Sequence, residues 1–182
     1  PSIYHYYPSR DELVTELIVD AFNSLAESQL QAITAASLAD HAARLVTLAQ
    51  AYRTWAVSYP QRYQLIFGTP IPGYVAPEEI TLPAATAGFV PLTEVLQAAF
   101  MAGRLKVERL PPITQALKTM LEAWQEVEGN SHPEVLYLAL VFWSRIHGLV
   151  TFEINGQYPS FITDPGEIFK REIEQIIDQY FN

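Results

Sequence analysis

Residues 133 to 154 read PEVLYLALVFWSRIHGLVTFEI, and this stretch decides the class of fold. If this stretch forms a helix, apolar side chains lie on opposite sides of it. Arg145 is the one formally charged residue between Val135 and Phe152. A helix that is apolar all round has to be buried on every side. The stretch therefore predicts a buried helix in an all-α protein.

A membrane span is the alternative interpretation of residues 133–154. Arg145 and His147 stand near the middle of the segment, where a charged residue costs about 2.5–3.5 kcal/mol on insertion scales. Charged residues in the middle of a span are rare. We therefore favour the buried helix and expect no membrane partner.

Outward from this helix, the spacing of apolar residues stays helical, and no alternating run between hairpin turns predicts a strand. Three segments have the spacing of a capping box, namely Ser9–Glu12, Ser37–Asp40 and Asp164–Glu167. Pro60 fits the first turn of a short helix that Gly68 closes. The expected helices cover about residues 9–35, 38–59, 60–67, 84–104, 113–127, 133–154 and 164–182.

The positions of the prolines predict one long loop between the expected helices. Residues 69–83 contain four prolines and one glycine, so we expect a loop there. Pro91 is expected either to mark the start of the next helix or to kink it.

The last helix has an apolar stripe on one side and charged residues on the other. Together with residues 133–154 it offers more apolar surface than one subunit can cover. We therefore expect a homodimer in which these two helices of each copy form a four-helix bundle about a two-fold axis. The expected interface residues are Val135, Leu149, Ile168, Ile173, Ile176, Ile177 and Tyr180.

Composition narrows the class of function. The 182 residues are 49% hydrophobic and carry a net charge of −9, and they include no cysteine. The absence of cysteine excludes disulfides, thiolate metal sites and cysteine catalysis, and a reduced cytoplasm fits it. Because phosphate contacts need basic residues, the bulk of the chain is unsuited to nucleic acid. These properties favour a soluble module that binds small molecules or protein partners.

Two segments resemble one family. The opening SIYHYYPSRDEL (Ser2–Leu13) resembles the signature of tetracycline-repressor-type (TetR) transcription regulators, at the junction between their DNA-binding and regulatory domains. WSRIHGLV (Trp143–Val150) is similar to the Trp/His/Gly motif of the WHG-type regulatory domain in that family. YRTWA (Tyr52–Ala56) and YPQRYQLIFG (Tyr59–Gly68) also look like that subgroup.

The resemblance implies a TetR-like regulatory bundle. Residues 1–8 would be the end of a recognition helix, and residues 9–182 would be the ligand-binding and dimerisation domain. The rest of a basic helix-turn-helix would lie upstream. Such a protein is a homodimeric repressor that binds palindromic operator DNA and responds to a small hydrophobic effector. The alternative is a helical small-molecule-binding or scaffolding protein with no DNA role, which predicts a native start at or near Pro1.

The opening also supplies the candidate DNA contacts, which are Tyr4, His5, Tyr6 and Arg10. A phenol can donate to a phosphate, and an arginine pairs with one strongly. The family usually has histidine where this chain has Tyr6, so a phenol replaces an imidazole there. The alternative is a frayed, partly packed terminus.

A set of aromatic residues and one histidine forms the candidate ligand site. Aromatic residues between helices form either an apolar ligand pocket, which the resemblance implies, or ordinary core. His147 is either a polar group that orients the ligand or a neutral histidine with its ring nitrogens hydrogen-bonded inside. The candidate ligand residues are Trp55, Tyr59, Phe67, Phe89, Phe100, Trp124, Phe142, Trp143 and His147.

The sequence also predicts roles for Arg145 and Gly148, which lie next to His147 or close to it in the chain. An unpaired buried charge is costly, so Arg145 is expected to pair with Glu153 or with an acidic residue elsewhere. Gly148 is expected to permit close helix approach.

Catalytic and metal motifs find no support in the sequence. The four histidines, His5, His41, His132 and His147, are far apart and show no zinc spacing. No nucleophile elbow, phosphate loop or dinucleotide fingerprint is present. We therefore expect no enzyme, no cofactor and no metal.

Overall fold

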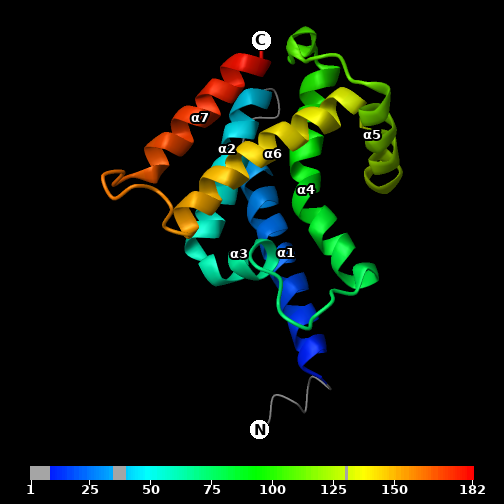
Figure 1. The fold of residues 1–182 in the computed structure, drawn as a ribbon. Helices are drawn as coiled ribbons and strands as arrows, with labels where there is room; N and C mark the ends of the chain where they lie inside the picture. Colours follow the sequence, from blue (N-terminus) through cyan, green and yellow to red (C-terminus); the bar gives the residue numbers. More distant parts are fainter. Residues whose placement is uncertain (1–8, 35–39, 130) are drawn as a thin grey trace.

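The computed structural model describes residues 9–34, 40–129 and 131–182, and within these ranges the chain is helical (Figure 1). The one extended pairing in this part is an isolated bridge between Leu105 and Phe181. The α-helices are α1 (Arg10–Thr34), α2 (His41–Ser58), α3 (Pro60–Phe67), α4 (Glu78–Met101), α5 (Gln115–Glu128), α6 (Pro133–Ile154) and α7 (Pro165–Tyr180). A short 3-10 helix, η2 (Val107–Arg109), precedes α5. The expected all-α class is confirmed.

Side-chain caps fix several helix starts. Ser9 Oγ accepts a hydrogen bond from the amide of Glu12 at 3.1 Å, as its spacing predicted. Asp40 Oδ1 accepts from the amide of Ala43 at 2.8 Å, so Asp40 caps α2. The other half of that predicted pair, Ser37, lies outside the described residues.

The start of α4 corrects the loop that we expected over residues 69–83. The helix begins at Glu78, and both Pro83 and Pro91 lie inside it. Each proline removes one backbone donor, but the buried face of α4 packs against α1 and α2 and holds the helix together. The axis of α4 changes direction part-way along its length in Figure 1, as expected for a proline kink.

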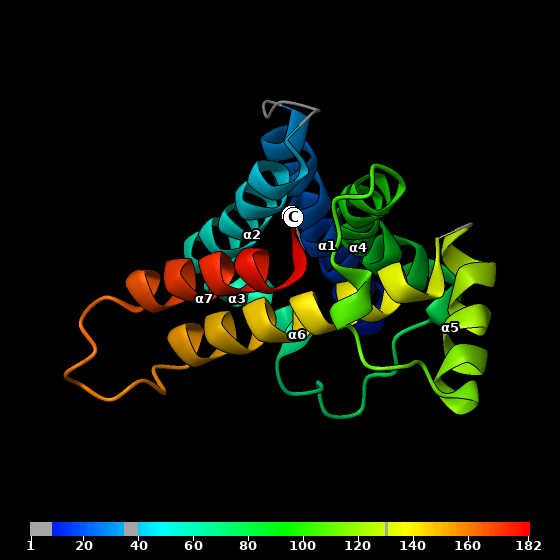
Figure 2. The same ribbon diagram turned by 90° about the horizontal axis from the view of Figure 1, so that it is seen from above.

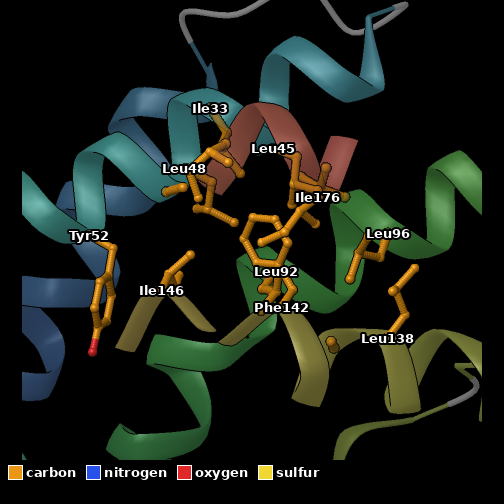
Figure 3. Packing of buried hydrophobic residues seen from close by; sticks show 14 of the residues in the cluster. Ile33, Leu45, Leu48, Tyr52, Leu92, Leu96, Leu138, Phe142, Ile146 and Ile176 are labelled. Carbon is orange, nitrogen blue, oxygen red and sulfur yellow. The ribbon is translucent and has the colours of Figure 1, made fainter. Parts of the chain in front are cut away.

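Helix α6 lies across α2 and α4, and α7 lies beside α6 and packs against α2 (Figures 1 and 2). Residues of α2, α4, α6 and α7 meet in the core, where Leu45, Leu96, Phe142 and Ile176 are almost fully buried (Figure 3). The amino end of α1 lies at the opposite end of the molecule from the C-terminus (Figure 1). One helix therefore runs from the core to the end of the bundle where the chain begins.

The prediction that residues 133–154 are buried on every side is wrong for a single chain. Leu140 is 38% exposed and Phe152 is 51% exposed, and both lie on α6. By length and composition alone α6 could cross a membrane, and so could α4, which the sequence did not single out. Core helices of soluble proteins also pass that test.

Candidate functional site

A cavity of about 220 Å³ lies inside the bundle. Its wall comes from α1, α2, α3, α4 and α6 and contains no charged residue. Figure 3 shows four of the lining residues, Leu48, Tyr52, Leu92 and Ile146. The complete lining is Phe22, Leu25, Gln29, Leu48, Tyr52, Phe67, Ala85, Gly88, Phe89, Leu92, Trp143 and Ile146.

Aromatic rings form much of the cavity wall. Phe67 meets Phe22 edge to face, with 5.8 Å between ring centroids, and Phe89 meets Trp143 edge to face at 6.1 Å. Such pairs hold their rings in a defined orientation. The wall is therefore suited to a flat, apolar molecule.

Gly88 brings α4 close to α1 at the cavity. A Cβ placed on Gly88 would lie 3.8 Å from Leu25 and 3.9 Å from Phe22. These are ordinary contact distances, so alanine would fit, whereas a longer side chain would extend toward residues that line the cavity. A glycine at this point keeps part of the space between the two helices open.

Behind the cavity wall, Tyr52 is joined to His147 of α6 by a hydrogen bond. Tyr52 Oη lies 2.7 Å from His147 Nδ1, and Tyr63 Oη lies 3.2 Å from the same nitrogen. Tyr63 Oη also lies 2.7 Å from Thr151 Oγ1. The network therefore joins α2, α3 and α6 through side chains.

Burial sets the protonation states of this network. Burial raises the pKa of the Tyr52 phenol well above its ordinary value, and it also raises the pKa of Tyr63. Burial lowers the pKa of His147. Because the phenols stay protonated and the imidazole stays neutral, we assign Tyr52 as the donor and His147 Nδ1 as the acceptor.

Gln29 is the polar exception on the α1 side of the cavity. The residue is 4% exposed, and its Oε1 has no hydrogen-bond partner in the described part of the chain. A buried, unpaired amide oxygen costs free energy. Gln29 lines the cavity, so a ligand bound there would lie beside this residue.

Residues 45–176 match the sequence profile of a family domain described as tetracyclin repressor-like, C-terminal domain. The chain belongs to the tetracycline-repressor family. The family is the one that both segments of the sequence resemble; Trp143–Val150 lies inside the matched region, whereas Ser2–Leu13 lies before it. The matched region also contains most of the cavity-lining residues.

Known relatives of this TetR-family chain include mycobacterial proteins. It is 29% identical over 179 residues to the HTH-type transcriptional regulator Rv1816 of Mycobacterium tuberculosis and to Mb1846 of Mycobacterium bovis. The alignment covers 97% of this chain and 76% of each relative.

Solved structures share the fold. The crystal structure of SCO4313, a protein described as regulatory, has 35% sequence identity and a TM-score of 0.77, and the match covers 96% of this chain and 77% of that one. A protein of unknown function from Rhodococcus sp. RHA1 has a TM-score of 0.70 at 19% identity, covering 98% of this chain and 79% of that one.

The cavity brings together only some of the predicted ligand residues. Phe67, Phe89 and Trp143 line it, and His147 lies behind the wall, with 4.9 Å between its ring centroid and that of Trp143. Five predicted residues lie away from the lining, because their rings pack elsewhere in the bundle or face solvent. These are Trp55, Tyr59, Phe100, Trp124 and Phe142.

Sequence reasoning missed Gln29 as a ligand-facing residue. It stands four residues after Leu25 and seven after Phe22, so all three lie on one face of α1. The signal was a polar residue between two apolar ones, Leu25 and Ile33, on the buried stripe of α1. Tyr52 was placed on the apolar side of its helix and in a resembling segment, but not among the candidate ligand residues.

The predicted DNA-contact residues lie mostly outside the described part of the chain. Tyr4, His5 and Tyr6 fall within residues 1–8, which are not described. Arg10 is the first residue of α1 and is exposed. An exposed arginine at this end of the bundle is available for a phosphate contact.

Four of the predicted dimer residues belong instead to the core of one subunit. Val135, Ile173, Ile176 and Tyr180 are at most 8% exposed in a single chain, so they have little surface left for a partner. A charged substitution at Ile173 or Ile176 would therefore disrupt the subunit itself. The other predicted interface residues, Leu149, Ile168 and Ile177, are partly buried.

The ion pairs place Arg145 beside an acidic residue of α7. Arg145 Nε lies 3.4 Å from Glu172 Oε1, whereas Glu153 pairs with Arg53 at 2.6 Å. We expected Arg145 to pair either with Glu153 or with an acidic residue elsewhere, and the partner found is Glu172. Arg53 makes two hydrogen bonds to Glu153, which joins α2 to the end of α6.

Proposed function

We propose that this chain is the effector-binding and dimerisation part of a DNA-binding transcription regulator, a repressor that works in the cytoplasm. The observation that carries the proposal is the uncharged cavity inside a TetR-family bundle. Ligand cavities of proteins are concave, mostly apolar and lined by aromatic side chains. The HTH-type naming of the mycobacterial relatives supports the DNA-binding role.

Helix α1 is the proposed connection between the cavity and DNA. Phe22, Leu25 and Gln29 of α1 line the cavity, and the same helix begins at the exposed Arg10. A ligand that contacts α1 can therefore favour one position of the helix over another. It shifts operator affinity only by its difference in affinity for the two states.

Residues 1–8 are proposed to be the end of a DNA-binding domain. The chain as a whole carries a net charge of −9, so its acidic bundle is a poor phosphate-binding surface. Contacts to the phosphate backbone are therefore assigned to Tyr4, His5, Tyr6 and Arg10 and to a basic helix-turn-helix preceding them. Residues 9–182 would form the regulatory domain.

Helices α6 and α7 are proposed to pair with those of a second copy. On α6, Leu140, Ser144, Gly148 and Phe152 recur at every fourth residue and so share one face, and a Cβ at Gly148 would meet nothing within 4 Å in the subunit. Small residues between two apolar ones allow a second α6 to approach closely. The two copies would form the four-helix bundle expected from the sequence.

Selection from random duplex DNA with the full-length protein tests this function. A dimeric repressor is expected to enrich an inverted repeat whose half-sites lie about one helical turn apart or a multiple of it. Failure to enrich any sequence at physiological salt would reject the regulator. It would favour the alternative of a helical small-molecule-binding or scaffolding protein without a DNA role.

A further inference from the structure

Two polar residues of the cavity wall, Tyr52 and Gln29, differ in whether their side chains have a hydrogen-bond partner within the described residues. Tyr52 points its hydroxyl at His147 Nδ1 at 2.7 Å, so this phenol has an internal partner. Gln29 Oε1 has none among the described residues, although only 4% of the Gln29 surface is exposed. One residue of the cavity lining therefore carries an acceptor whose hydrogen bond is not made among the described residues.

The donor that this oxygen needs is not supplied by the part of the chain that the structure describes. Buried carbonyl oxygens in folded proteins are nearly always hydrogen-bonded, to protein or to water. Other residues that line the cavity, such as Leu25, Leu48 and Leu92, have only carbon atoms in their side chains. A molecule lodged in the cavity can supply the donor that these residues lack.

The lining also determines the charge of the ligand. No Lys, Arg, His, Asp or Glu is among the residues that line the cavity. An ion placed there would lose its hydration without gaining a counter-charge, which is strongly unfavourable. The aromatic wall of Phe67, Phe89 and Trp143 favours a flat apolar body.

We propose that the cavity takes a neutral, flat and largely apolar ligand with one hydrogen-bond donor, and that Gln29 Oε1 accepts that hydrogen bond. This inference rests on the proposed function of the cavity as an effector site. It adds the chemical class of the effector. It also names Gln29 as the residue that distinguishes a ligand with a hydrogen-bond donor from one of the same shape without a donor. Gln29 then orients the ligand along α1, the helix that connects the cavity to the DNA-binding end.

Calorimetric titration of the 182-residue chain with indole and with benzofuran tests the donor. The two probes have nearly the same shape, but only indole carries an N–H group. Benzofuran is the less polar, so a purely apolar wall would favour it. We expect wild type to bind indole at least about 5-fold more tightly than benzofuran, because benzofuran leaves Gln29 Oε1 unpaired.

The variant Gln29→Met removes the acceptor at nearly constant volume. The preference for indole is expected to disappear in this variant, and benzofuran is expected to bind as well as it binds wild type or better. Gln29→Leu is the second variant if Gln29→Met does not fold. Equal or tighter binding of benzofuran by wild type, or an indole preference that persists in Gln29→Met, would overturn the role of Gln29.

A second pair of probes tests the charge. The wild-type chain is expected to bind 2-naphthamide and to bind 2-naphthoate at least about 10-fold more weakly, because the carboxylate is an ion without a counter-charge. Equal binding of the two would overturn the neutral class. If none of the four probes binds, the cavity is not a site for small aromatic molecules, and that part of the proposed function fails as well.

Discussion

The hydroxyl of Tyr52 lies 2.7 Å from Nδ1 of His147, and this hydrogen bond joins a wall residue of the cavity to α6. His147 directly precedes Gly148 on α6, the helix whose exposed face carries Gly148 and Phe152. Movement of Tyr52 on ligand binding would therefore act directly on α6, and through α6 on subunit pairing.

Replacing Tyr52 by phenylalanine removes this hydrogen bond and leaves the ring in place. We expect the free energy of unfolding to fall by about 1–2 kcal/mol, because His147 Nδ1 loses its shorter hydrogen bond in a buried setting. Urea denaturation measures the loss. Tyr59→Phe is the matched control, since Tyr59 is 48% exposed, and it should change stability by less than about 0.5 kcal/mol. Equal losses in the two variants would contradict the role of the network.

Acid is expected to destabilise the chain partly through His147. Burial lowers the pKa of this histidine in the folded state below its unfolded value of 6.5. Below pH 6.5 the unfolded chain therefore binds a proton that the folded chain does not, and stability falls as the pH falls toward the folded pKa. Above pH 6.5 both states are neutral, and this contribution is complete.

His147→Asn tests that pH dependence. Asparagine keeps an acceptor near the position of Nδ1 but does not titrate. Urea denaturation between pH 7.5 and pH 5 is expected to show a smaller fall in stability for the variant than for wild type. Parallel curves for the two proteins would show that His147 contributes nothing to the acid response.

The exposed face of α6 is expected to be essential for dimerisation. Gly148→Trp places a large side chain where the subunit alone has open space, so the subunit should stay folded while the second copy is pushed away. Sedimentation velocity is expected to show a dimer for wild type and a monomer for the variant. Ala123→Trp, at an exposed position on α5, is the matched control and should remain dimeric. A monomeric wild type, or a dimeric Gly148→Trp protein, would be inconsistent with pairing through this face.

The helices and their caps could be predicted because their signals are local. Ser9 and Asp164 cap α1 and α7 from within three residues of the groups they bind, so spacing alone reveals them. The start of α4 could not be predicted in this way. Its two prolines disfavour a helix locally, but packing of Leu92 and Leu96 against other helices outweighs that cost.

The candidate site was harder to predict, because apolar residues are required both in a core and at an interface. Ile173 and Ile176 lie on the predicted apolar stripe, yet the stripe faces the core of the same subunit. In the same way, Phe142 and Trp143 are sequence neighbours of similar character, but only Trp143 reaches the cavity. Gln29 gained its importance from contacts between α1 and α4, which are distant in sequence.

The most direct test of the central claim is an NMR titration of the chain with indole, comparing Gly88→Leu with Ala87→Leu. Gly88 lines the cavity, whereas its neighbour Ala87 is exposed on the same helix. Wild type and Ala87→Leu are expected to show saturable shifts at the amide of residue 88 and at the indole N–H of Trp143, and Gly88→Leu is expected to show none. Shifts confined to surface residues, or unchanged binding by Gly88→Leu, would contradict a ligand site inside this bundle.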